Sequence, residues 1–180
     1  RRGEARAVVT NPIAKAALYQ AGFKHPGHTE YLGELAKAWG QPSFPVMMIW
    51  SEALAVVPVT IHIPLAEAPK ALTAELIIKT ARIVDRDLRA RFGVTRPRLA
   101  VASLNPHAGE AGHLGREELD VIQPVIAELK AEGLNILGPI PADTAFTPAF
   151  LQTVDVIVAM YHDQGLPVIK HVGFGHAVNV

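Results

Sequence analysis

Short apolar segments typical of β-strands alternate along this chain with segments of helical periodicity, and this alternation is the strongest constraint on its fold. In one strand-like segment, apolar residues take every second position: Val57, Val59, Ile61 and Ile63. In the next segment, steps of three and four residues place an apolar stripe on one helix face: Ile77, Ala81, Val84 and Leu88. Alternating strands and helices predict an α/β fold with a largely buried sheet.

The same patterns predict the remaining elements. Strands are expected at residues 6–10, 46–50, 57–63, 99–103, 135–137 and 154–160. Helices are expected at residues 13–18, 28–39, 73–92 and 116–132, with a short one ending at residue 150. The last residues have the pattern of another element that has just begun. We therefore expect the chain to be part of a longer protein, and the sequence marks no internal lobe boundary.

Charge and composition exclude several classes of protein. The 180 residues contain 17 Lys+Arg and 17 Asp+Glu, so the formal net charge is zero. This balance argues against a nucleic-acid-binding surface and against a polybasic membrane anchor, because both need an excess of positive charge. With 49% hydrophobic and 19% charged residues, the chain is not a disordered one. The low charged fraction also suggests that a partner covers part of the surface.

The absence of cysteine excludes disulfides, thiolate metal sites and thiol nucleophiles. The most apolar stretch, residues 44–66, is interrupted by Pro45, Pro58 and Pro64, so it is more typical of buried strands than of a membrane helix. The first residues contain no apolar signal region. We therefore expect a cytoplasmic protein without a membrane anchor.

Three loops combine a histidine with polar residues and with glycine or proline. They contain His28 (PGHTE), His107 (NPHAGE) and His162 (YHDQG). The last two follow predicted strands directly, and ligands of open α/β sheets bind at the carboxyl ends of strands. Three converging imidazoles would hold a divalent cation and leave coordination positions free for water or substrate. Imidazole suits Zn, Co, Ni or Fe, and Mn where oxygen ligands complete the shell.

These polar residues also have interpretations that involve no ligand. A single loop histidine more often makes a hydrogen bond or a cap than a metal bond, and His62 is expected on the second face of a strand. Asp143 and Asp163 could orient metal-bound imidazoles, and Asp143 could equally cap a helix or a turn. Lys170 could bind a phosphate or carboxylate, or lie in solvent at the end of a strand.

Glycines in the second histidine loop would let the backbone approach a ligand closely, although an ordinary long turn explains them as well. The sequence contains no G-x-G-x-x-G fingerprint, P-loop, G-x-S-x-G or H-E-x-x-H motif. If a nucleotide binds, a standard dinucleotide-binding fold is not what holds it.

Taken together, the motifs resemble those of the 4-hydroxythreonine-4-phosphate dehydrogenase family of vitamin B6 biosynthesis. The matching stretches keep the family's order over nearly the whole chain: VTNPIAK (9–15), PGHTEYL (26–32), VPVTIHIPL (57–65), LNPHAGEAGHLG (104–115), PADT (141–144) and AMYHDQGLPVIK (159–170). The resemblance implies a three-layer α/β/α fold like that of isocitrate and isopropylmalate dehydrogenases, with two lobes and a cleft. Family members are longer at both ends, so residues 1–180 would form the central part of such a protein.

The resemblance also implies roles for individual residues. The positions that match the family's metal ligands are His28, His107 and His162, and those that match its substrate contacts are Lys170 and Asn179. Asp143 and Asp163 fall in active-site motifs, whereas no cofactor-binding residue can be assigned. The family's homodimers have the active site at the subunit interface and share the metal between partners.

The implied reaction is the NAD- or NADP-dependent oxidation of 4-phosphooxy-L-threonine to 2-amino-3-oxo-4-phosphooxybutanoate. This product decarboxylates to 3-amino-2-oxopropyl phosphate during pyridoxal 5'-phosphate biosynthesis. The reaction would also need a divalent metal: Zn, Co, Mg, Mn or Ni. Three alternatives remain open at this point. They are a sister dehydrogenase acting on threonate or erythronate 4-phosphate, a metal-dependent hydrolase or lyase that needs no nucleotide, and a truncated core without a competent site.

Overall fold

The computed structural model describes residues 9–10, 14–25, 27–40 and 44–180, which belong to two compact units, Arg1–Pro45 and Val46–Val180. The N-terminal unit contains two helices, α1 (Lys15–Gln20) and α2 (His28–Ala38). The second confirms the helix expected at residues 28–39. Most of the strand expected at residues 6–10 lies outside the described residues, and its last two residues, Val9 and Thr10, are in no strand.

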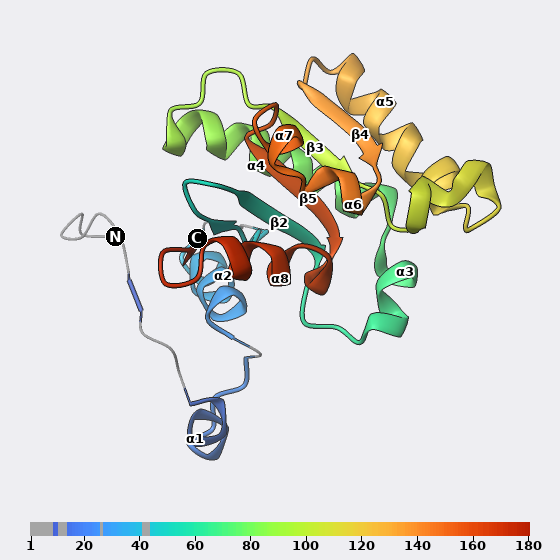
Figure 1. The fold of residues 1–180 in the computed structure, drawn as a ribbon. Coiled ribbons are helices and arrows are strands. Elements are labelled where there is room, and N and C mark those ends of the chain that lie inside the picture. The colour runs from blue at the N-terminus through green and yellow to red at the C-terminus, as the bar shows by residue number, and fades with distance from the viewer. Residues whose placement is uncertain (1–8, 11–13, 26, 41–43) are drawn as a thin grey trace. The chain divides into compact units, whose positions relative to one another are not determined.

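The C-terminal unit is built around a mixed sheet with the strand order β4-β3-β5-β2-β1-β6 (Figure 1). Its parallel strands are β2 (Ala55–Thr60), β3 (Leu99–Ala102), β4 (Ile136–Ile140) and β5 (Val156–Tyr161). Two short antiparallel strands extend the sheet beside β2: β1 (Ile49–Trp50) and β6 (Val178–Asn179). The central register pairs Val57 with Val158 and Leu99 with Val156. All the parallel strands therefore end at the same edge of the sheet.

Helices cover both faces of this sheet, so the C-terminal unit has three layers (Figure 1). One face carries α4 (Ala74–Phe92), the π-helical turn η3 (Glu118–Ile122) and α5 (Gln123–Ala131). The other face carries α6 (Ala142–Ala145), α7 (Pro148–Leu151) and α8 (His162–Val172). Alternate residues of each strand face the two layers, so Val57 packs with the first and Val56 with the second. Burial on both faces explains why these strands are almost continuously apolar.

Two short helical segments, η1 (Leu65–Glu67) and α3 (Ala68–Ala71), connect β2 to α4. Within the described part of the chain, no helix combines the length and the apolar character that crossing a membrane requires.

The ends of α4 follow directly from its sequence. Thr73 precedes the helix in an extended conformation, and its side-chain oxygen accepts a hydrogen bond from the Leu76 N–H. Gly93 ends the helix with a left-handed φ of 71°, which glycine adopts at little cost. Between these caps, the apolar stripe from Ile77 to Leu88 is buried. The helix expected at residues 73–92 is therefore confirmed.

We expect Thr73→Ala to lower the free energy of unfolding by about 1 kcal/mol, because it removes the side-chain acceptor at the start of α4. Urea denaturation of the chain measures this change. The matched control is Thr95→Ala, an exposed position that caps no helix and should change stability by less than about 0.5 kcal/mol. Equal effects of the two substitutions would contradict the capping role.

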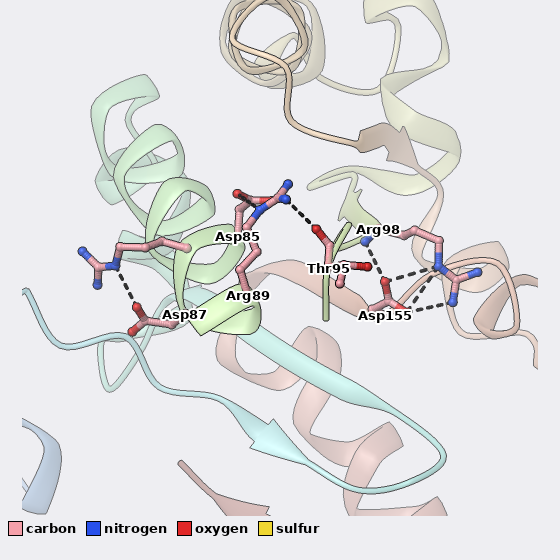
Figure 2. A network of polar contacts seen from close by, with 7 residues as sticks. Asp85, Asp87, Arg89, Thr95, Arg98 and Asp155 are labelled. Atoms are coloured by element: carbon pink, nitrogen blue, oxygen red, sulfur yellow. Dashed lines mark hydrogen bonds and ion pairs between the residues drawn. The ribbon is translucent and has the colours of Figure 1, made fainter. Parts of the chain in front are cut away.

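Arg98 and Asp155 fasten the amino-terminal ends of β3 and β5 together (Figure 2). The Asp155 carboxylate accepts hydrogen bonds from the Arg98 backbone N–H at 2.7 Å and from Arg98 Nη2 at 2.8 Å. Burial alone would raise the pKa of Asp155. The hydrogen bonds from the Arg98 side chain and backbone, together with the Arg98 charge, outweigh burial and lower that pKa. The carboxylate therefore stabilises the fold when it is ionised.

The lowered pKa of Asp155 makes its contribution to stability dependent on pH. The contribution is complete above the unfolded-state pKa of about 4 and is lost as the pH falls through the lower folded-state value. We expect Asp155→Asn to lower the free energy of unfolding by about 2 kcal/mol at neutral pH. Denaturation at a series of pH values should show the difference from wild type shrinking below pH about 4.

The control for this measurement is Asp120→Asn, which removes an exposed pair with Arg116 one helical turn away. Surface pairs of this kind contribute about 0.5 kcal/mol or less. If Asp155→Asn lowered the free energy of unfolding by the same amount down to the lowest measurable pH, the stabilising role of the ionised Asp155 would be contradicted.

Two expectations about the elements were wrong. The strand expected at residues 57–63 ends at Thr60, because the chain turns at His62 with a φ of 48°. Lys170, which the sequence allowed at the end of a strand, lies in the last turn of helix α8. The sequence did not predict α8 because Pro167 lies inside it, and proline has a very low propensity for the interior of a helix.

Candidate active site at the carboxyl ends of the parallel strands

Polar residues follow the parallel strands at the edge where those strands end. His62 comes after β2, His107 after β3, Asp143 after β4, and His162 with Asp163 directly after β5. In open α/β sheets, this is the edge at which ligands bind. Four of the predicted site residues therefore lie at one edge of the sheet. His62, which was expected within a strand, lies at the same edge.

The loop that carries His107 has an unusual backbone. Within Pro106–Gly112, the φ angles are 51° at His107, 53° at Ala108, 44° at Glu110 and 53° at Ala111. A left-handed φ costs about 1–2 kcal/mol for a non-glycine residue, so the surroundings must hold this loop in place. Strain of this kind concentrates at functional sites.

A fully buried glutamate, Glu118, holds the base of this loop. Its Oε1 accepts hydrogen bonds from the backbone N–H groups of Leu104 and Asn105, at 2.8 and 2.7 Å. Its Oε2 accepts one from Asn105 Nδ2 at 2.9 Å. Gly109 packs against the same carboxylate, where a Cβ atom would lie 2.7 Å from Oε2. Glycine is therefore required both for its φ of 78° and for the space.

Asn105 joins Glu118 to its neighbour Glu117. Its Nδ2 also donates to Glu117 Oε2 at 2.7 Å. The backbone N–H of Glu117 itself, and after it the Asn105 amide, lower the pKa of Glu117. Glu118 is the first residue of the π-helical turn η3, and such turns are frequent at functional sites.

Gln164 connects the ends of β3 and β5. Its buried side chain donates from Nε2 to the Ser103 carbonyl at 2.6 Å and accepts at Oε1 from the Met160 N–H at 2.7 Å. The Ser103 hydroxyl in turn donates to the Asn105 carbonyl at 2.9 Å. These bonds fix the position of the His107 loop relative to the start of α8, which carries His162.

His162 and Asp163 form a close pair at the start of α8. The His162 Nδ1 lies 2.6 Å from Asp163 Oδ1, with side chains 35% and 77% exposed. A carboxylate that accepts the Nδ1 proton leaves the lone pair on Nε2, which is how proteins orient a metal-binding imidazole. The pair therefore fits the predicted role of His162 as a metal ligand, with Asp163 as the residue that orients it.

Of the other predicted residues, Asp143 lies at this edge of the sheet, whereas Lys170 and Asn179 lie elsewhere. Asp143 is exposed in the first turn of α6 and accepts a hydrogen bond from the Thr144 hydroxyl at 3.2 Å. Lys170 is exposed eight residues after His162 in α8, about 12 Å away along the helix axis. Asn179 is exposed in β6 opposite Ile49. The side chains of His162 and Lys170 therefore start more than two helical turns apart on α8.

His28 begins helix α2 in the N-terminal unit, and its side chain is outside the described part of the chain. Among the side chains that the structure describes, no three histidines or carboxylates are gathered as metal ligands. The site of His28, His107 and His162 therefore stays a prediction. Two of its members lie at the edge of the sheet where ligands bind.

Sequence reasoning missed Glu118, Gln164 and Ser103 as parts of this site, and it dismissed His62. For Glu118 a signal was present, because it lies four residues before the apolar Ile122 and so continues the buried stripe of its helix. A carboxylate on the buried face of a helix is expected to accept hydrogen bonds from buried donors. Nothing local in the sequence marks the partners of Gln164 and Ser103, which meet only through strand pairing.

Comparisons with known proteins point to the same family as the sequence motifs. The family model described as pyridoxal phosphate biosynthetic protein PdxA matches residues 1–180. A protein of Bradyrhizobium diazoefficiens named 4-hydroxythreonine-4-phosphate dehydrogenase is 57% identical over the whole chain. The alignment covers 52% of that relative, so the chain spans about half the length of the curated relatives it matches.

Two solved structures are similar to the fold. The crystal structure of 4-hydroxythreonine-4-phosphate dehydrogenase from Klebsiella pneumoniae has a TM-score of 0.82 and 40% identity, covering 94% of this chain and 51% of that one. A terephthalate 1,2-cis-dihydrodiol dehydrogenase from Burkholderia xenovorans has a TM-score of 0.74 and 29% identity, covering 92% of this chain and 51% of that one. The expected α/β fold is thereby confirmed.

Proposed function

The chain belongs to the PdxA family of pyridoxal phosphate biosynthetic proteins, and from this premise we propose that the whole protein is an NAD- or NADP-dependent 4-hydroxythreonine-4-phosphate dehydrogenase. The observation that carries the proposal is the 57% identity to a protein of that name over all 180 residues. The strained His107 loop at the ligand-binding edge of the sheet supports it.

The proposed reaction is a two-electron oxidation followed by loss of carbon dioxide. The secondary alcohol of 4-phosphooxy-L-threonine gives a hydride to the nicotinamide ring and a proton to solvent, which produces 2-amino-3-oxo-4-phosphooxybutanoate. Breaking the bond to its carboxylate then releases carbon dioxide, and uptake of one proton gives 3-amino-2-oxopropyl phosphate.

In this proposal, His28, His107 and His162 would hold a divalent metal. When bound, such a metal lowers the pKa of an alcohol and stabilises negative charge on oxygen, while the nicotinamide accepts the hydride. Asp163 keeps His162 in the tautomer that presents Nε2, through their 2.6 Å contact. Glu118 holds the loop that presents His107.

Two of the remaining predicted residues, Lys170 and Asn179, bind and orient the substrate, whereas Asp143 is proposed to orient a metal-bound imidazole. Lys170 provides a cationic group and Asn179 an amide for the anionic end of the substrate. Asp143 is exposed at the start of α6 and lies at the same edge of the sheet as His107. We further propose that two copies of the protein form a homodimer with the active site at their interface, in which the metal is shared between the copies.

The test is turnover by the purified whole protein with 4-phosphooxy-L-threonine and each nicotinamide cofactor. Formation of reduced nicotinamide is followed by absorbance, and 3-amino-2-oxopropyl phosphate is identified by mass spectrometry. Removal of divalent metal with a chelator should abolish the signal, and adding back Zn, Co, Mg, Mn or Ni separately should show which metal supports it. The proposal would be contradicted if neither nicotinamide cofactor were reduced with any of these metals present.

A sister dehydrogenase is the second candidate. It is favoured by one observation, namely that a structure with a TM-score of 0.74 is named for a different substrate, a terephthalate dihydrodiol. Threonate and erythronate 4-phosphate are the alternative substrates, and competition against 4-phosphooxy-L-threonine ranks them by kcat/KM. A hydrolase or lyase would instead turn over without nicotinamide, and a truncated core would show no turnover.

A further inference from the structure

Gln164 is a polar residue buried in the first turn of α8, two positions after His162. An amide side chain is mostly found in solvent, because its donor and its acceptor both need partners when it is buried. Both partners are present at the ends of two neighbouring strands: the carbonyl of Ser103 after β3 and the N–H of Met160 in β5. One side chain of a helix thereby joins two strands of the sheet.

The amide of Gln164 continues the pairing of β3 and β5 at the point where their backbones stop pairing. The register of the two parallel strands ends with Val101 opposite Val158. Carried two residues further, it would place Ser103 opposite Met160, yet both of these residues bond to Gln164 instead, at 2.6 and 2.7 Å. A direct ladder would hold the strands about 4.8 Å apart, so an amide inserted between them widens the sheet at the edge where ligands bind.

Close packing on the sheet fixes the start of α8. Gly165 follows Gln164, and a Cβ atom at Gly165 would overlap a methyl group of Val56 in β2 and touch the Cβ atom of Ala159 in β5. Helix α8 packs against both of these strands (Figure 1). The backbone of Gln164 therefore has a fixed place, and its side chain holds the end of β3 at a set distance from that place.

Each end of this bridge leads to one of two histidines. His162 lies two residues before Gln164 in the same helical turn. On the other side, the Ser103 hydroxyl donates to the Asn105 carbonyl at 2.9 Å, and His107 follows two residues later. The separation of the two imidazoles therefore depends on the hydrogen bonds of the Gln164 side chain. Bonds from zinc to imidazole are about 2.0–2.1 Å long, so a displacement of about 0.5 Å at either ligand weakens binding of a metal that both hold.

We propose that Gln164 is a positioning residue of the active site, whose buried amide sets the separation between His107 and His162 without touching metal or substrate. The inference rests on the proposed function, in which both histidines hold the metal. It adds a residue that supports two ligands at once, because Gln164 bonds to the strand end before one histidine and shares a helical turn with the other. Removing a residue that supports a metal ligand costs about 10- to 100-fold in metal affinity.

The test uses the whole protein with Gln164→Met, because methionine has a similar length and makes neither hydrogen bond. We expect the dissociation constant of Co²⁺, titrated without substrate or nicotinamide, to rise about 10- to 100-fold. The visible absorption bands of the bound Co²⁺ should shift, because they depend on the arrangement of its ligands. With Co²⁺ at saturation, kcat should fall by about 10-fold or more, because the reacting groups are misplaced.

A second variant and a matched control separate positioning from general stability. Gln164→Asn keeps the amide on a shorter side chain that reaches only one strand end, so it should lose less Co²⁺ affinity, and it carries the test if Gln164→Met does not fold. The control is Ser51→Ala, at the amino end of β2, where a buried hydroxyl donates to the Leu54 carbonyl at 3.1 Å and accepts from the Leu54 N–H at 3.2 Å. Ser51→Ala should lower the unfolding temperature and leave the Co²⁺ dissociation constant and absorption bands as in wild type.

Metal binding and turnover separate this inference from the proposed function. An unchanged Co²⁺ dissociation constant and spectrum in the Gln164 variants would overturn the inference, as would equal changes in Ser51→Ala, since the effect would then be one of stability alone. Wild-type protein that binds no Co²⁺ would overturn it as well. Wild-type protein that binds Co²⁺ but oxidises no substrate would sink the proposed function, whereas weaker Co²⁺ binding by Gln164→Met would still support the positioning role.

Discussion

Replacing Glu118 by alanine is expected to lower the free energy of unfolding by about 3 kcal/mol and to release the His107 loop. The substitution leaves the partly buried backbone N–H groups of Leu104 and Asn105 without their acceptor. Each buried donor that loses its partner costs about 1–3 kcal/mol. The strain relieved in Pro106–Gly112 offsets only part of this cost, because the loop loses its packing against the carboxylate at the same time.

Urea denaturation of the chain measures the stability, and amide hydrogen exchange of residues 104–115 reports whether the loop is released. Glu117→Ala is the matched control, because Glu117 is only partly buried and accepts one side-chain hydrogen bond from Asn105. It should cost less than about 1 kcal/mol. Glu118→Gln should fall between the two, since its amide oxygen can still accept from the backbone. Equal losses for the two alanine variants would contradict the assigned role of Glu118.

The elements that the sequence predicted well are those whose signals are local. Helix α4 has a capping threonine, an unbroken apolar stripe and a terminal glycine, and all three signals lie within its own residues. The end of β2 and the helix α8 escaped prediction for the opposite reason. The apolar alternation continues past Thr60 although pairing with β5 stops, and α8 contains Gly165 and Pro167, which lower helix propensity.

The candidate site also has a part that local sequence signals predict and a part that they do not. His107 and His162 could be placed at one edge of the sheet, because each directly follows a recognisable strand. The contacts that hold them could not be predicted, because they join residues distant in sequence. Gln164 bonds to the carbonyl of Ser103, and Thr60 bonds to that of Met160. Such pairs follow from strand order, which no local pattern in a single sequence specifies.

Replacing His107 by asparagine in the whole protein is expected to remove the metal and to abolish the NAD(P)-dependent turnover that we propose. Asparagine tolerates the left-handed φ of 51°, so the loop keeps its shape and the change is confined to the lost imidazole. Removing even a residue that only supports a metal ligand costs about 10- to 100-fold in metal affinity, and removing a ligand itself should cost at least about 100-fold. Mass spectrometry after dialysis against a divalent-metal mixture measures the metal content.

The most informative control is His113→Asn, because His113 is an exposed histidine in the same segment between β3 and η3. It should retain metal and activity, which separates the loss of one imidazole from any general effect of changing the loop. Hydrogen exchange of residues 104–115 should be unchanged in both variants, whereas Glu118→Ala raises it. Loss of metal without a change in exchange would therefore assign His107 to the metal and Glu118 to the loop. Retention of metal by His107→Asn would remove His107 from the proposed ligand set, and the proposed site of three histidines would then be wrong.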